Sequence, residues 1–174
     1  MRPGLIFWTA VVAFVIDQGS KFLVVHGMGL DQRRAIDVFP PFLNFRYGEN
    51  RGINFGLLDS DADAARWALI GFSLLVCAVV AIWAGRRADA SGTMRVSAGL
   101  LIGGALGNVL DRLLYGHVLD FLNMSCCGIS NPFVFNVADV FIFAGAVGLV
   151  LFDGRKDGGA SNGKTPRDLG RKMG

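Results

Sequence analysis

Two aspartates, Asp120 and Asp139, are the residues of this sequence whose type and spacing best suit chemistry. Asp139 lies inside the apolar run 132–152, which is long enough to cross a membrane. A carboxylate at the centre of a bilayer costs roughly 2.5–3.5 kcal/mol, so it usually marks a functional site. Two neighbouring carboxylates can share one proton, so that one activates water while the other polarises a carbonyl group. The pair therefore predicts a hydrolytic site.

The composition places these aspartates in a membrane protein. The chain has 174 residues, of which 52% are hydrophobic and 18% are charged, whereas soluble domains average about 25% charged residues. Arg2 precedes an apolar run that starts at Leu5, as in a signal peptide. No small-residue cleavage motif follows this run, so we interpret it as an uncleaved first membrane helix.

Four apolar segments are long enough to span a bilayer as helices. We predict spans at about 5–25, 67–84, 95–115 and 132–152. These segments lack the period-two alternation of a membrane β-barrel. The expected fold is therefore membrane α-helical, with four transmembrane helices in one domain over residues 1–152.

The distribution of Lys and Arg indicates how these helices are oriented. Ten Lys and Arg residues lie before the first span, around the connection between the second and third, and after the fourth, against five in loop 26–66 and none in loop 116–131. By the positive-inside rule, both termini lie inside (N-in, C-in) and loops 26–66 and 116–131 lie outside. Alternating apolar residues in 42–47 predict one or two short strands, and hence a small β-containing extracytoplasmic subdomain. The basic tail 153–174 is expected to be disordered and to face the anionic inner leaflet.

The ionisable side chains within the spans are all expected in the outer half of the membrane. With a rise of about 1.5 Å per residue, Asp17 lies roughly 12 Å and Asp139 roughly 10 Å below the outer ends of their helices. Asp111 and Arg112 lie within about 6 Å of the outer end of theirs, and Asp120 follows on the outer side. Because these groups would be costly facing lipid, we expect them to surround a polar cavity open to the outer surface.

Helical spacing brings further polar residues onto the same faces. Asn108 precedes Asp111 and Arg112 by three and four residues, and Asn136 precedes Asp139 by three. Residues at these separations are neighbours on a helix surface. Either asparagine could serve equally well as a hydrogen bond between helices or as a contact to substrate.

Structural roles compete with functional ones for the remaining groups. We expect Asp111 and Arg112 to form a buried ion pair, and Asp17 and Lys21 to form another on the first helix. The stretch Gly103–Gly107 contains a small-xxx-small pattern, which permits close approach of a neighbouring helix.

The cysteines suggest no metal site. Cys77 lies in an apolar run and is expected to be inert packing. Cys126 and Cys127 are adjacent, with no further Cys or His at zinc-like spacing, and we expect two thiols there, with a strained disulfide between them as the alternative.

Three classes of function fit an intramembrane carboxylate. An aspartyl hydrolase uses the pair directly. A proton- or ion-coupled transporter also needs carboxylates, but the inner halves of the spans lack ionisable residues and the sequence has no inverted repeat. A structural subunit leaves the cost of Asp139 unexplained.

Five sequence blocks, in order, resemble the motifs of bacterial lipoprotein signal peptidase, also called signal peptidase II. They are Asp17–Lys21 (D-Q-x-[ST]-K), Asn50–Gly56 (N-x-G-x-x-F), Gly103–Arg112 (G-G-x-x-G-N-x-x-D-R), Gly116–Phe121 (G-x-V-x-D-F) and Phe135–Asp139 (F-N-x-A-D). The resemblance covers about residues 5–152. One departure is that Ile53 and Asn54 stand where the family often has two alanines.

The resemblance implies that Asp120 and Asp139 are the catalytic pair of an aspartic endopeptidase. It marks as site or supporting residues Asp17, Lys21, Asn50, Gly52, Asn108, Asp111, Arg112 and Asn136. It implies cleavage of prolipoprotein signal peptides just before a cysteine that carries diacylglyceryl, without metal or cofactor, and inhibition by the cyclic peptide globomycin. The expected partners are this prolipoprotein and membrane lipid, with no nucleic acid. The expected enzyme is a multi-pass monomer of the bacterial inner membrane, with its active site near the outer, periplasmic face.

Overall fold

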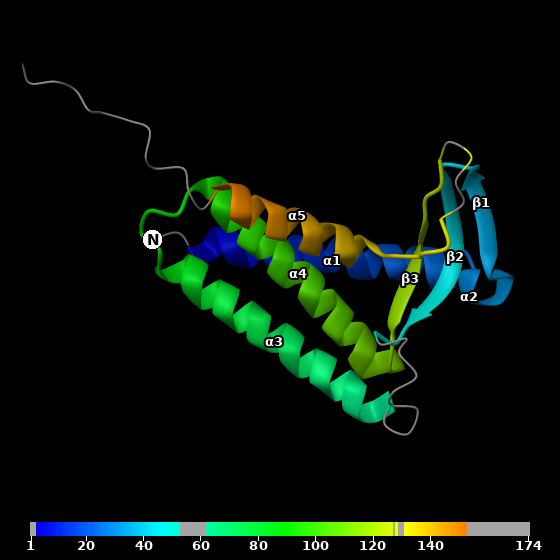
Figure 1. Ribbon diagram of the computed structural model, residues 1–174, viewed down its shortest axis with the longest axis horizontal. Helices are drawn as coiled ribbons and strands as arrows, with labels where there is room; N and C mark the ends of the chain where they lie inside the picture. Colours follow the sequence, from blue (N-terminus) through cyan, green and yellow to red (C-terminus); the bar gives the residue numbers. More distant parts are fainter. Residues whose placement is uncertain (1–2, 53–61, 127, 129–130, 153–174) are drawn as a thin grey trace, which may run out of the picture.

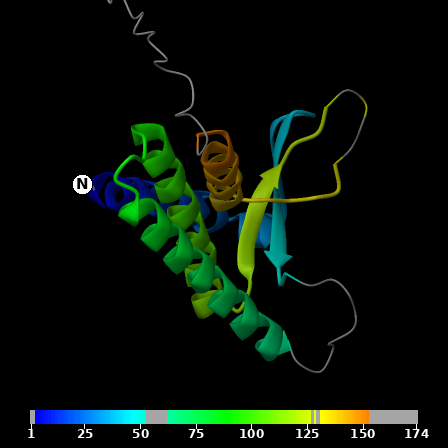
Figure 2. The same ribbon diagram turned by 60° about the vertical axis from the view of Figure 1, so that its left-hand side comes forward.

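A bundle of long helices carries a small sheet at one end (Figure 1). The computed structural model describes residues 3–52, 62–126, 128 and 131–152. The bundle consists of α1 (Pro3–Lys21), α3 (Ala62–Arg86), α4 (Gly92–Tyr115) and α5 (Val137–Phe152). The sheet lies at the end of the bundle opposite the N-terminus, and its strands run across the helix axes (Figures 1 and 2).

The helix bounds agree with the first three predicted segments. α1 continues into a π-helix, η1 (Phe22–Gly27), and the helices over Gly4–Gly27, Asp63–Arg86 and Gly92–Tyr115 are long and apolar enough to cross a membrane. At the start of α4, the Ser91 hydroxyl accepts a hydrogen bond from the Met94 N–H at 3.1 Å. This cap satisfies one of the N–H groups that a helix start leaves unpaired, and it adds a turn before the predicted start at 95.

Helix α4 is the centre of the bundle and packs against α1, α3 and α5. Glycines allow this close packing, as their spacing predicted. A Cβ atom on Gly103 or Gly107 would overlap α1, and one on Gly104 would lie 2.6 Å from the carbonyl oxygen of Ala138 at the start of α5. Small residues therefore bring the polar ends of three helices together.

The prediction of a helix over 132–152 is wrong at its start, because α5 begins at Val137. Phe135 instead pairs with Leu122 as an extended bridge. The Asn136 side-chain oxygen accepts from the Asp139 N–H at 3.0 Å, and an Asp139 carboxylate oxygen accepts from the Asn136 N–H at 3.1 Å. This reciprocal capping box starts the helix. Asp139 is therefore in the first turn of α5, not about 10 Å below its end.

The sheet is antiparallel and has the order β1–β2–β3. β1 (Ala35–Phe39) and β2 (Leu43–Asn50) confirm the short strands predicted in the first loop. β3 (Val118–Asn123) lies where only a loop was expected, and a short helix, α2 (Leu30–Arg33), precedes β1. The register places Asp120 of β3 opposite Gly48 of β2.

A hydrophobic core separate from the core of the bundle packs this sheet against the bundle. Val25 of η1 and Leu30 of α2 are buried against Leu119 and Phe121 of β3. On β3, Leu119 and Phe121 flank Asp120 in the sequence, and all three are buried. The strand that carries the aspartate is therefore held firmly against the end of α1.

The cysteines differ in part from expectation. Cys77 is buried and free, as predicted. Cys126 is disulfide-bonded, so the expectation of a thiol there is wrong. Cys127 and the tail 153–174 lie outside the described residues.

Candidate active site

One asparagine joins the two aspartates. The Asn136 side-chain nitrogen donates to Asp120 Oδ1 at 2.6 Å, while the capping box described above ties the same residue to Asp139. Asn136 is 0% exposed. The residue that starts α5 thus also fixes Asp139 relative to Asp120 of β3.

Helix α4 supplies a further contact to Asp139. The Asn108 side-chain nitrogen donates to Asp139 Oδ1 at 3.0 Å, so both oxygens of this half-buried carboxylate accept hydrogen bonds. Asn108 and Asn136, for which two roles were open, thus both contact the aspartate pair. The prediction that the ionisable groups of the spans all surround a polar cavity is wrong for Asp17 and Asp111, which are 0% exposed and do not line the cavity beside Asp120.

Asp120 has a strongly perturbed pKa. Burial, followed by the charge of Asp139, raises the pKa of the Asp120 carboxyl from 3.8 to about 6. The side-chain amides of Asn136 and Asn50 and the charge of Lys21 act in the opposite direction. A carboxyl group with this pKa can take up and release a proton near neutral pH, as a general acid or base must.

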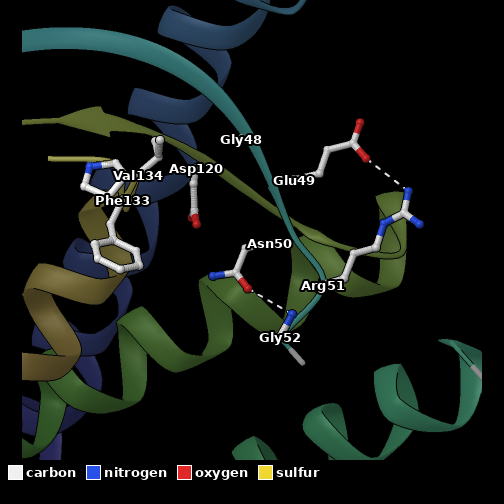
Figure 3. A pocket seen from close by; sticks show the side chains of 9 residues that line it. Gly48, Glu49, Asn50, Arg51, Gly52, Asp120, Phe133 and Val134 are labelled. Carbon is white, nitrogen blue, oxygen red and sulfur yellow. Dashed lines mark hydrogen bonds and ion pairs between the residues drawn. The ribbon is translucent and has the colours of Figure 1, made fainter. Parts of the chain in front are cut away.

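A cavity of about 410 Å³ opens beside Asp120 (Figure 3). It is lined by the end of β2 and the segment that leads to α5: Gly48, Glu49, Asn50, Arg51, Gly52, Pro132, Phe133 and Val134. Asp120 projects into this space, and the Asn50 amide nitrogen points to the same region (Figure 3). The volume suits a short peptide segment or another small ligand.

The predicted residues Asn50 and Gly52 form a turn at the rim of this cavity. The Asn50 side-chain oxygen accepts from the Gly52 N–H at 3.0 Å, which aims its amide nitrogen away from the turn (Figure 3). Gly52 has φ +87°, and a Cβ there would overlap Leu69 of α3. Glycine is therefore required at this position. Ile53 and Asn54 lie outside the described residues.

A second polar cluster lies next to the aspartate pair. Lys21 Nζ is 2.8 Å from Asp17 Oδ2 and 2.8 Å from Asp111 Oδ2, and it donates to Asn108 Oδ1 at 3.1 Å. The predicted pair between Asp17 and Lys21 is confirmed, and Lys21 is 2% exposed.

The predicted ion pair between Asp111 and Arg112 is wrong. Asp111 is 0% exposed and turns to Lys21 of α1, since adjacent residues on a helix point in different directions. Arg112 donates to the Asn108 carbonyl oxygen at 3.4 Å and interacts electrostatically with Asp139, Asp111 and Asp120. It therefore belongs to the site, although its role differs from the predicted one.

Gln18 is the site residue that the sequence analysis missed. Its side-chain nitrogen donates to Asp111 Oδ1 at 2.9 Å, to Asp17 Oδ2 at 3.1 Å and to the Gly107 carbonyl oxygen at 3.2 Å. A signal was present, since an amide stands between charged residues in the block Asp17–Lys21. Among the residues that the structure describes, no three His, Cys, Asp or Glu side chains are arranged to hold a metal ion.

Comparison with known proteins places the chain in a family. A family model described as signal peptidase (SPase) II matches residues 9–153. The chain belongs to the signal peptidase II family. The chain is 39% identical to a lipoprotein signal peptidase of Sphingopyxis alaskensis, over 92% of this chain and 91% of that protein. It is 40% identical to a lipoprotein signal peptidase of Methylorubrum extorquens, over 86% and 84%.

Solved structures show the same fold. A bacterial membrane enzyme determined by the in meso method at 1.9 Å resolution superposes with a TM-score of 0.71 at 26% identity, over 87% of this chain and 94% of that one. A second, at 2.3 Å resolution, gives a TM-score of 0.67 at 27% identity, over 85% and 86%. Together with the long apolar helices, these relatives establish a multi-pass membrane protein of a peptidase family.

Proposed function

We propose that this protein is an intramembrane aspartic endopeptidase. It removes the signal peptide from diacylglyceryl-modified prolipoproteins by cleaving just before the lipidated cysteine. The observation that carries the proposal is the pair of carboxylates joined by Asn136 beside a cavity, in a member of the signal peptidase II family.

The two aspartates divide the chemistry of hydrolysis. The ionised carboxylate takes a proton from water as the water oxygen attacks the scissile carbonyl carbon. The protonated carboxyl gives its proton to the carbonyl oxygen, which forms a tetrahedral intermediate. As the carbon–nitrogen bond breaks, a proton passes from the first carboxyl to the leaving amine. One hydroxyl of the intermediate returns its proton to the second carboxylate as the carbonyl re-forms, so both carboxyl groups recover their starting protonation states. Because the carboxylates are coupled, the two apparent pKa values belong to the pair.

Neutral amides and one cation assist these steps. The Asn50 amide nitrogen, at the rim of the cavity, can donate to the substrate backbone or to the developing oxyanion (Figure 3). Arg112 provides positive charge beside the pair. No metal or other cofactor has a part in this proposal.

The position of the site suits a lipidated substrate. The aspartates lie at the sheet end of the bundle, where α4 ends and α5 begins. The distribution of Lys and Arg argues for an N-in, C-in arrangement, with the sheet on the outer, periplasmic face of the bacterial inner membrane. A signal-peptide helix and a diacylglyceryl group both reach that face from within the bilayer, and a monomer suffices for the proposed site.

The proposal is tested with purified protein and a synthetic preprolipoprotein peptide, either diacylglyceryl-modified or unmodified at the cysteine. Mass spectrometry should find a released signal peptide that ends one residue before the cysteine, from the modified peptide alone. Globomycin should block the release. Cleavage at another bond, or equal cleavage of the unmodified peptide, would contradict the proposal.

A further inference from the structure

The two catalytic aspartates are held in the same way, each through the residue before it. The Leu119 N–H, one residue before Asp120, donates to Asp111 Oδ2 at 3.1 Å. The Ala138 N–H, one residue before Asp139, donates to Asp17 Oδ1 at 2.9 Å. In both cases a buried carboxylate from another element accepts a hydrogen bond from the backbone N–H of the residue that precedes the reacting group.

The two carboxylates that accept these bonds, Asp17 and Asp111, share two further partners. Lys21 lies 2.8 Å from each of them, and the Gln18 amide spans the same two at 3.1 and 2.9 Å. With Asn108 as third acceptor, all three ammonium protons of Lys21 have a partner. A continuous chain of contacts therefore runs from Asp120 to Asp139 through residues that do not line the cavity.

This arrangement is built on rigid parts of the fold. Asp17 and Asp111 are both 0% exposed, and Asp17 fits against α4 because Gly107 has no side chain there. Gln18 also donates to the Gly107 carbonyl oxygen at 3.2 Å. Movement of α1 relative to α4 would break several buried polar contacts at once, each of which is costly to leave unmade.

Stability alone is a weak reason for such a cluster. Replacing buried ion pairs by well-packed apolar residues is often neutral or stabilising. A buried ion pair is therefore better explained by a role in fixing one relative position of the elements that it joins. We propose that Asp17, Gln18, Lys21 and Asp111 form a brace that sets the separation of the two catalytic carboxylates. Gln18 and Lys21 are then positioning residues. The inference rests on the proposed function, because it takes Asp120 and Asp139 as the reacting groups.

Gln18 is the residue on which to test the brace. Removing Lys21 also removes a charge that acts on Asp120 directly, whereas Gln18→Met changes a neutral side chain into another of similar length. Gln32→Met is the matched control, because it makes the same substitution at an exposed glutamine of α2 outside the site.

The readout is the pH dependence of kcat with the diacylglyceryl-modified peptide. Mutual repulsion separates the two apparent pKa values of a carboxylate pair, so a looser pair has a narrower bell-shaped profile. In Gln18→Met we expect kcat to fall about tenfold, because misplacement by about 1 Å costs up to about 10²-fold. KM should stay within about twofold of the value for the parent protein, and the two limbs of the pH profile of kcat should lie closer together. Gln32→Met should match the parent protein.

Other outcomes overturn the brace. If kcat falls but both limbs of its pH profile stay in place, the substitution has only reduced the amount of folded protein. If neither kcat nor its pH profile changes, Gln18 has no role in positioning. Should Gln18→Met fail to fold, the same profile is measured for Asp111→Asn, which keeps an oxygen for Leu119 but loses the ion pair. Failure of both variants to fold assigns the cluster to stability and also refutes the inference.

The brace and the proposed function fail in different ways. If the parent protein releases no signal peptide, the proposed function is refuted. If the parent protein is active and the pH profile of Gln18→Met is the same as that of the parent protein, only the brace is refuted.

Discussion

The molecule contains two pairs of aspartates side by side, and they differ in what lies between them. Lys21 lies between Asp17 and Asp111, at 2.8 Å from each. Asn136 lies between Asp120 and Asp139. An ammonium between two carboxylates offsets their repulsion, whereas a neutral amide leaves that repulsion in place. The first pair is therefore suited to hold structure, and the second to hold a proton.

Burial separates the two pairs in the same sense. Asp17 and Asp111 are inaccessible, while Asp120 borders the cavity and Asp139 is half-buried. Residue type alone thus does not identify a catalytic carboxylate. The bridging group and the access to substrate distinguish the two pairs.

The largest expected effect is loss of catalysis in the pair joined by Asn136. Asp120→Asn and Asp139→Asn each remove a proton acceptor that nothing nearby replaces. We expect turnover of the lipidated peptide to fall on the order of 10⁴-fold, with the variants still folded in detergent. Asp37→Asn, on exposed β1 beside Arg46, should stay within about twofold of the parent protein. Turnover retained within about tenfold in either catalytic variant would refute the two-aspartate mechanism.

The next effect is loss of stability in the pair joined by Lys21. Lys21→Met leaves two buried carboxylates without their counter-ion, and breaking a buried pair in this way costs about 3–5 kcal/mol. Unfolding in micelles by denaturant measures this change. The double variant Lys21→Met/Asp111→Asn has one uncompensated charge fewer, so it should recover part of the loss. A loss below about 1 kcal/mol for Lys21→Met would mean that the charge of this lysine is not needed there.

A third test removes the amide between Asp120 and Asp139. Asn136→Ala loses the contact to Asp120 and the cap of α5. We expect kcat to fall by about 10²–10³-fold, as for other groups that stabilise charge at a reacting centre. The alkaline limb should move to higher pH, because Asp120 has the raised pKa of the pair and the Asn136 amide lowers it. Asn44→Ala removes a buried amide at the far end of β2 and should leave the profile in place.

The smallest expected effect is the change in stability when one aspartate of each pair is replaced by asparagine, and its sign is opposite in the two pairs. The pKa of Asp120 is about 6 in the folded protein against 3.8 as its ordinary value. The folded state therefore binds more protons in this window, and its stability falls as pH rises from about 4 to about 6. The side chain introduced by Asp120→Asn does not titrate, so this variant should be more stable than the parent protein by about 3 kcal/mol at pH 8 and gain little at pH 4.

Asp111→Asn is the counterpart, and it should be less stable than the parent protein at pH 8 because it loses the ion pair with Lys21. Thermal unfolding of both variants at the two pH values measures the contrast. Destabilisation of Asp120→Asn at pH 8 would show that its charge is structural, like that of the first pair.

Much of this arrangement could be predicted from the sequence. Apolar length predicted the first three long helices, and the alternation in 42–47 predicted strands in the first loop. The spacing of Asn108 from Asp111 and of Asn136 from Asp139 brought polar groups to one place. These are local patterns, in which the period of a helix or strand decides which residues share a face.

The contacts between elements could not be predicted in this way. Hydropathy cannot tell an extended apolar segment from a helix, so residues 132–136 were assigned to the fourth span. Asp111 was paired with its sequence neighbour Arg112, although the packing of α1 against α4 offers it Lys21 instead. The role of Gln18 depends on the same packing, since the oxygens that it joins come from two helices.

The late start of α5 has a consequence for the surrounding lipid. Its 16 residues span about 24 Å, against a hydrocarbon thickness of about 30 Å. The apolar sequence also ends there, before Asp153. We therefore expect a bilayer that meets this side of the protein to thin locally or draw polar backbone inward, as in other cases of hydrophobic mismatch. Thinning beside Asp139 would bring headgroup water closer to the carboxylates. If the proposed function holds, it would also shorten the distance between the lipidated cysteine of the substrate and the aspartate pair.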